Sequence, residues 1–215
     1  MFRNRTEAGI LLADKLKNYK YNKDAIIVTI PRGGVPIGYA MATRLHLPLE
    51  IVLSKKIGHP LHKEFAIGAV TLHDRILSPD SDSILKEYLD RETKKIRDLL
   101  QWRHDTYYGS HAPISLKNKI IILVDDGVAT GQSLISCIKL IEKQNPAKII
   151  IALPVGPPSV INKINNIPSV NQTICLLTPS DFYSVGQFYN EFDQVDDDEV
   201  VELLNKANNQ FLINS

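Results

Sequence analysis

The stretch from residue 120 to residue 133 carries the polar groups with the clearest chemical meaning. The apolar run 120–124 predicts a buried strand, and two carboxylates, Asp125 and Asp126, follow where that strand should end. A loop of small residues then leads into a helical apolar pattern. Backbone N–H groups in such a loop and at a helix N-terminus bind phosphate well. The residues expected to form this phosphate-binding loop are Gly127, Val128, Ala129, Thr130, Gly131 and Ser133.

The two carboxylates disfavour some ligands of this loop and favour others. Asp125 and Asp126 would repel a second phosphate group unless a cation lay between them, but they can accept hydrogen bonds from neighbouring hydroxyls. A ribose 5-phosphate group offers both a phosphate and a pair of such hydroxyls. The alternative is an Asp pair that only caps the following turn.

A second candidate anion site follows the apolar run 25–30. Arg32 provides a planar donor group suited to phosphate oxygens, and Gly33 and Gly34 let the backbone approach an anion closely. Taken alone, this turn is weak support for a binding site. Because it should lie at the end of a strand beside the first site, we expect the two to act together.

Two lysines, Lys55 and Lys56, follow the apolar run 49–54. Side chains alternate along a strand, so we expect only one of the two to reach the site. The alternative is that both lysines are solvated.

The elements that must position these residues alternate along the chain. Continuous Ile- and Val-rich runs predict strands covered on both faces, and amphipathic segments between them predict helices. This order indicates an α/β fold with a doubly wound, mostly parallel sheet. The predicted strands are 25–30, 49–54, 119–124, 148–155 and 172–177, and the predicted helices are 5–18, 34–46, the segment after Gly131, and 157–166.

Two regions interrupt this alternation within what we expect to be a single domain, 1–215. Residues 63–77 suggest a hairpin or edge strands, and 81–106 a long helix with Ser81 and Ser83 as candidate N-caps, within a helical insertion at about 78–112. Residues 178–212 should form a small hood and an acidic C-terminal helix, roughly 196–210.

Composition excludes several classes of protein. Hydrophobic residues make up 44% and charged residues 23%, and the formal net charge is +1, so neither nucleic acid nor an anionic membrane is indicated as a partner. The sequence lacks a long apolar run and a signal-type N-terminus, so we expect a soluble cytoplasmic protein. The two cysteines, Cys137 and Cys175, should be buried thiols.

The segment 124–131, VDDGVATG, resembles the phosphoribosyl-diphosphate (PRPP) binding motif of the type I phosphoribosyltransferases. The segments FRNRTEAG (2–9), IPRGG (30–34) and FAIGAV (65–70) look like a bacterial and archaeal subgroup of predicted phosphoribosyltransferases. The resemblance implies transfer of 5-phosphoribosyl from PRPP to a nucleobase or related nitrogen acceptor, with release of diphosphate. It assigns catalytic roles to Arg32, Lys56, Asp125 and Asp126.

The same resemblance implies roles for the remaining groups. The 31–34 turn and Lys56 would hold diphosphate, and the 125–133 loop would hold ribose 5-phosphate. Magnesium would bind through PRPP and water, with Asp125 and Asp126 as candidate protein ligands. A homodimer would follow the family's habit. Whether the loop 57–64 or the loop 107–113 closes the site stays open, and the alternative for the second loop is surface packing.

The acceptor is less well defined. Ala129 stands where hypoxanthine-guanine enzymes carry an Asp, so that assignment is not favoured. The hood would choose the acceptor, and its aromatic residues are equally compatible with stacking on a base or with core packing: Phe182, Tyr183, Phe188 and Tyr189. Two alternatives stay open, a PRPP-binding regulator without turnover and another nucleotide-binding α/β domain with a single anion site.

Overall fold

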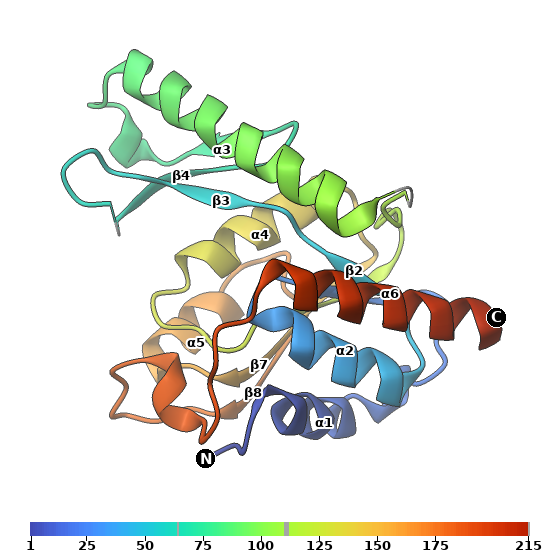
Figure 1. Cartoon of the computed structure of the whole chain (residues 1–215). Coiled ribbons are helices and arrows are strands. Elements are labelled where there is room, and N and C mark those ends of the chain that lie inside the picture. The colour runs from blue at the N-terminus through green and yellow to red at the C-terminus, as the bar shows by residue number, and fades with distance from the viewer. Residues whose placement is uncertain (64, 110–111, 215) are drawn as a thin grey trace.

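The central sheet of this computed structural model, which describes residues 1–63, 65–109 and 112–214, has five parallel strands in the order β2-β1-β6-β7-β8 (Figure 1). The Ile- and Val-rich runs form these strands because both faces of the sheet are covered, and all five residues of β1 are buried. The predicted doubly wound α/β fold is confirmed. The strands are β1 (Ala25–Thr29), β2 (Leu49–Ile51), β6 (Ile120–Val124), β7 (Lys148–Val155) and β8 (Gln172–Leu177).

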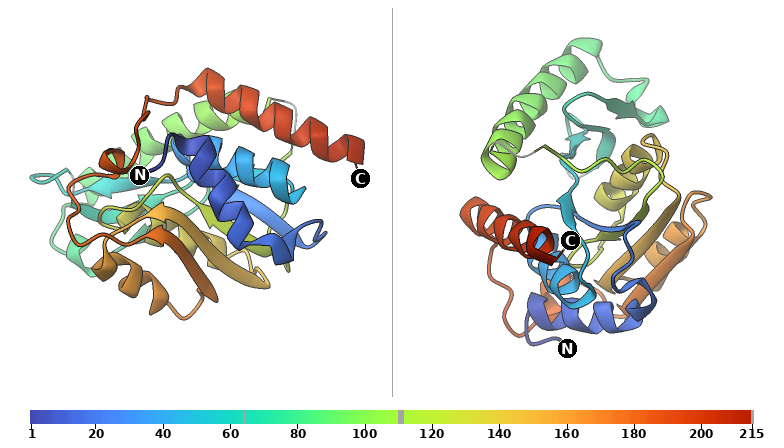
Figure 2. Two further views of the ribbon diagram at one scale, coloured as in Figure 1. Left: turned by 90° about the horizontal axis from the view of Figure 1, so that it is seen from below. Right: turned by 90° about the vertical axis from the view of Figure 1, so that its right-hand side faces the viewer.

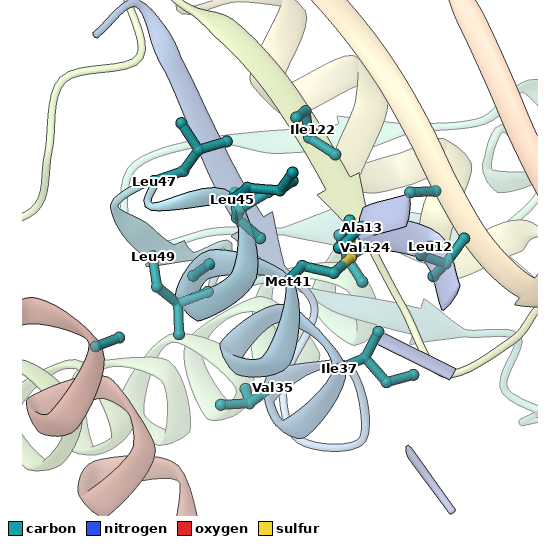
Figure 3. Packing of buried hydrophobic residues seen from close by; sticks show 14 of the residues in the cluster. Leu12, Ala13, Val35, Ile37, Met41, Leu45, Leu47, Leu49, Ile122 and Val124 are labelled. Carbon is teal, nitrogen blue, oxygen red and sulfur yellow. The ribbon is translucent and has the colours of Figure 1, made fainter. Parts of the chain in front are cut away.

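Helices cover the two faces of this sheet and create two cores. Along β6, Ile122 and Val124 pack into one core, whereas Ile121 and Leu123 pack into the other, as strand alternation requires. Figure 3 shows the first core, where side chains from α1 and α2 meet β6. α1 (Arg5–Lys15), η1 (Lys17–Tyr19) and α2 (Gly34–Leu45) lie on this side, and α4 (Gln132–Glu142) and α5 (Pro158–Asn165) on the other.

The predicted strand 49–54 was too long. β2 ends at Ile51, and after Val52 the chain leaves the central sheet to begin an antiparallel three-stranded sheet in the order β3-β4-β5. The apolar run stops there, and of the four residues of β3 only Ile57 is buried. The predicted hairpin at 63–77 is therefore part of a larger sheet, made by β3 (Lys55–Gly58), β4 (Ala66–Val70) and β5 (Arg75–Leu77).

A long helix packs on this second sheet, apart from the central one (Figures 1 and 2). α3 (Lys86–Tyr108) buries Leu89, Ile96 and Leu100 against the sheet, which gives the inserted region its own small core. The helix begins five residues later than predicted, and its N-cap is Leu85. Ser81 instead ends the short helix η2 (Pro79–Ser81), where its hydroxyl donates to the Ser78 carbonyl, so the prediction of Ser81 or Ser83 as N-cap was wrong.

The C-terminal region returns to the core. α6 (Asp197–Asn214) buries Val200 and Leu204, and it contacts α2 and α3. Before it, η3 (Val185–Phe188) lies beside the N-terminus, where the Phe2 amide donates to the Phe188 carbonyl at 2.8 Å (Figure 2). In the described part of the chain, no helix is both long and apolar enough to cross a lipid bilayer.

Candidate functional site

The loop after β1 lies directly against the loop after β6. A Cβ atom added at Gly33 would lie 2.0 Å from Asp126 Oδ2, and one added at Gly34 would lie 2.9 Å from the Val124 carbonyl oxygen. Only glycine permits this approach. The peptide bond between Pro31 and Arg32 is cis. The structure therefore brings the two predicted anion-binding loops together at one edge of the sheet.

The loop after β6 opens toward solvent through part of its length. Gly127 and Gly131 have φ angles of +154° and +77°, conformations that favour glycine. Ala129, Thr130 and Ser133 are exposed at the start of α4, where helix amide groups could meet a phosphate. Val128 differs from its neighbours, because its side chain is in the core and its amide donates to the Val155 carbonyl at 2.9 Å. That amide is thus engaged within the protein.

Asp126 is paired with an arginine that no sequence pattern had singled out. Arg5 Nε and Nη2 lie 3.1 and 2.9 Å from Asp126 Oδ2, and Arg5 Nη1 donates to the Asp193 carbonyl at 2.7 Å. The guanidinium carbon lies 3.8 Å from the centre of the Phe192 ring. Arg5 falls within the segment 2–9 that resembles the phosphoribosyltransferase subgroup, so that segment was the available signal.

Burial governs the ionisation of both carboxylates. Desolvation raises the pKa of Asp125 well above its usual range, and the neighbouring charge of Asp126 adds to the effect. Desolvation also raises the pKa of Asp126, while Arg5 opposes the shift. Asp125 Oδ1 accepts from the Asp126 amide at 2.9 Å, and the Asp126 carbonyl accepts from the Tyr189 hydroxyl at 2.7 Å. Arg5 is thus the main contact that favours a charged Asp126.

Arg32 is also paired in this structure. Its Nη1 lies 3.3 Å from Asp197 Oδ2 at the start of α6, and Tyr107 donates to the other oxygen of that carboxylate. Arg103 Nε is 3.9 Å from Asp197 Oδ1. α3 and α6 therefore meet at the loop after β1.

A cavity of about 520 Å³ joins the two loops to the hood, a volume within the usual range for small-molecule sites. A larger cavity of about 780 Å³ lies among α1, α2 and α6, but the predicted ligand-binding residues do not line it. The smaller one is lined by Arg5, Arg32, Gly33, Asp126, Val185, Phe192, Asp193, Gln194 and Val195.

Among the described residues, Lys56 is not one of those that line this 520 Å³ cavity. It lies in β3, opposite Ala69 of β4, because the chain has already left the central sheet. The role of Lys56 in holding diphosphate stays a prediction.

The aromatic residues of the hood divide between packing and exposure. Tyr189 is buried, Phe182 and Phe188 pack together with ring centres 5.4 Å apart, and Tyr183 is 89% exposed. Among the described residues, the aromatic side chain that lines the cavity is Phe192, which was not predicted as a site residue. The segments 57–64 and 107–113 were the two loops considered for closure of the site. Residues 64 and 110–111 of these loops lie outside the described residues, so closure stays a prediction.

The parallel sheet is covered by helices on both faces, and the loops after two neighbouring strands meet at their carboxyl ends. This architecture fits the type I phosphoribosyltransferases, the class that the segment 124–131 resembles. Residues 5–188 match the family model of the phosphoribosyl transferase domain. The chain belongs to this family, and the resemblance noted in the sequence is confirmed.

Two groups of similar proteins extend the comparison. Proteins of Mycobacterium tuberculosis strains H37Rv and CDC 1551, named provisionally as phosphoribosyl transferases, are 31% identical over 217 residues, which cover 98% of this chain. The match covers 48% of their length, so this chain spans about half of these relatives. The crystal structure of the protein TT1426 from Thermus thermophilus has a TM-score of 0.83 and 33% identity, and the match covers 95% of this chain and 98% of that one.

A more distant structure shares the fold. A protein from Neisseria gonorrhoeae, solved with bound ppGpp, has a TM-score of 0.52 and 16% identity, and the match covers 94% of this chain and 92% of that one.

Proposed function

We propose that this protein is a magnesium-dependent phosphoribosyltransferase that transfers 5-phosphoribosyl from PRPP to a nitrogen of a nucleobase or related acceptor. The observation that supports this most is the close approach of Gly33 to Asp126, which brings the two predicted anion-binding loops to one cavity. PRPP has an anionic group at each end of a ribose, so it needs two anion sites with hydroxyl acceptors between them. A domain with a single anion site would not need this contact.

The residues would act by position and charge. In the reaction the bond between the anomeric carbon and the diphosphate oxygen breaks, a bond to the acceptor nitrogen forms, and the acceptor proton passes to solvent. Arg32 and the Gly33 amide would hold the departing diphosphate, whereas the Gly34 amide donates to the Ile30 carbonyl at 3.2 Å. Asp125 and Asp126 would accept ribose hydroxyls and lie near the positive charge that develops on the ring.

The site's oxygen donors suit magnesium, which prefers carboxylates, phosphates and water. Among the described residues there is no cluster of three or more His, Cys, Asp or Glu that could hold a metal alone. We therefore infer that Asp125 and Asp126 would supply at most part of the ligand set. When bound, magnesium would neutralise charge on the diphosphate.

The acceptor would enter from the side of the hood. Phe192 and Val185 line that side of the cavity, and Arg5 lies beside them. Ala129 lacks the carboxylate that assists purine deprotonation in hypoxanthine-guanine enzymes, so we do not favour their acceptors. A homodimer and a cytoplasmic location stay predictions.

The test is diphosphate release from PRPP and magnesium with a panel of nitrogen bases. We expect release with at least one base, and its loss, by at least about a thousandfold, in the double variant Asp125→Asn, Asp126→Asn. Asp98→Asn, an exposed carboxylate on α3, is the matched control and should keep full turnover.

Unchanged turnover in the double variant would contradict the site assignment. PRPP binding without release for any base would instead indicate the regulatory alternative. Thermal melting of both variants would establish that each is folded.

A further inference from the structure

The carboxylate of Asp197 sits among three donors from two other elements. Arg32 approaches Oδ2 from the loop after β1, and Tyr107 of α3 donates to Oδ1. Arg103, one turn earlier on α3, has its Nε 3.9 Å from Oδ1. The side chains of Arg32, Arg103 and Asp197 are 27%, 19% and 25% exposed, so the group is largely shielded from water.

Asp197 leaves one donor of this group without an acceptor. Arg103 Nε is buried and has no hydrogen-bond partner among the described residues. Tyr107 is 3% exposed, and burial together with the Asp197 hydrogen bond raises its pKa, so its hydroxyl stays protonated and must donate. Two cations and a hydroxyl thus surround a single negative charge. A buried donor without an acceptor is costly, and a ligand with more oxygens and more charge would remove that cost.

The position of Arg32 indicates which ligand this would be. Arg32 lines the 520 Å³ cavity, beside Gly33, whose amide is proposed to hold diphosphate. Carboxylate and phosphate oxygens make the same kind of charge-assisted hydrogen bond with arginine. Asp197 therefore occupies a place that suits a phosphate group.

We propose that Arg32, Arg103 and Tyr107 form an anion subsite for the diphosphate end of PRPP, and that Asp197 fills this subsite in the free protein and is displaced by the ligand. This inference rests on the proposed function and extends it. Arg103 and Tyr107 then supply donors in addition to Arg32. Because like charges repel, Asp197 lowers the affinity for diphosphate until it leaves.

The test measures binding of inorganic diphosphate by calorimetry, with and without magnesium, at fixed ionic strength. Asp197→Asn keeps the shape and an acceptor oxygen but removes the competing charge, so we expect Kd to fall on the order of tenfold. The matched control is Asp198→Asn, an exposed carboxylate in the same first turn of α6. It changes the net charge and the helix N-terminus equally and should leave Kd within about twofold.

A second pair of variants tests the donors. In the Asp197→Asn background, Arg103→Gln and Tyr107→Phe should each raise the Kd for diphosphate, by about tenfold and about threefold. Thermal melting would confirm that each variant is folded. An Asp197→Asn protein that binds diphosphate no better than Asp198→Asn, or that is indifferent to loss of Arg103, would overturn the proposal. Absence of diphosphate binding in every variant would overturn it too.

The same proteins separate this proposal from the proposed function. Normal PRPP turnover in wild type, with an unchanged diphosphate Kd in Asp197→Asn, would reject the subsite alone. Tighter diphosphate binding in Asp197→Asn, with no turnover of PRPP by the wild type for any base, would retain the subsite and reject the transferase.

Discussion

Arg5 shows how one residue can set the chemistry of a carboxylate. It contributes two nitrogens to Asp126 Oδ2 and fixes its own third nitrogen on the Asp193 carbonyl of the hood. Burial alone would favour the neutral form of Asp126, which could no longer act as a charged acceptor for ribose hydroxyls. Arg5 therefore connects the N-terminal helix to the hood, and it also favours the charged form of Asp126.

Replacement of Arg5 by Gln should shift the pH dependence of catalysis. Arg5 lowers the pKa of Asp126, so its removal raises that pKa, and the acidic limb of the kcat/KM profile should move to higher pH. Activity at neutral pH should fall on the order of tenfold or more. A pH–rate profile measures this, with Arg5→Lys as the variant that keeps the cation and should largely restore the limb. If kcat/KM of Arg5→Gln falls at every pH while the acidic limb stays at the same pH, Arg5 has only a packing role.

Glu50 has a structural role: it connects β2 to the end of α3 and to the segment before β6, and it does not line the 520 Å³ cavity. Its carboxylate accepts from the Ile51 amide at 2.8 Å, the Ile114 amide at 2.7 Å and the hydroxyl of Tyr108. It is 4% exposed, and this burial raises its pKa. Through it, edge strand β2 holds both the end of α3 and the segment that returns to β6. Because Tyr108 is the last residue of α3, this buried group links the end of that helix to β2.

Glu50→Ala should therefore destabilise the fold. It leaves three donors without their acceptor, two of them backbone amides, so we expect the free energy of unfolding to fall by about 2–4 kcal/mol. Urea denaturation at neutral pH measures the change. Tyr108→Phe removes one of the three hydrogen bonds and should cost about 1 kcal/mol. Equal stability of Glu50→Ala and wild type would show that the carboxylate does not hold these elements together.

At the scale of the molecule, three helices begin at the candidate site. Arg5 opens α1, Gly34 opens α2 and Asp197 opens α6, while their later turns pack on the sheet or on one another. Figure 1 shows α1, α2 and α6 side by side, with α3 and its sheet on the other side of α6. A ligand in the 520 Å³ cavity would contact α1, the loops after β1 and β6, and the hood at once, so its binding should stabilise the fold.

PRPP with magnesium at about a hundred times its Kd should add about 2.7 kcal/mol to the free energy of unfolding. For a chain of this size that corresponds to an increase in Tm of about 5–10 °C. Thermal melting measures the shift, which should be absent in the double variant Asp125→Asn, Asp126→Asn. An equal shift in that variant would place the ligand elsewhere.

Local patterns were sufficient to predict much of this protein. Continuous apolar runs predicted the five parallel strands, because a strand covered on both faces has no polar side to show. The segment 124–131 predicted the family, because all the residues of this motif are contiguous in the sequence and lie within one strand–loop–helix unit. The start of the second sheet and of α3 was less evident, since apolar periodicity fixes the existence of an element better than its ends.

The contacts between distant residues were decided by the tertiary structure. Arg5 and Asp126 are 121 positions apart, and Arg32 and Asp197 are 165 apart, so no local pattern pairs them. The position of Lys56 was likewise decided by the tertiary structure, which places it in β3 opposite Ala69 and not in the central sheet. Sequence alone specified the strands, the loops and their chemical types, because hydrophobic period and backbone preference are local. The partners of each charge were set by the folded chain, because packing brings together side chains whose separation in sequence carries no signal.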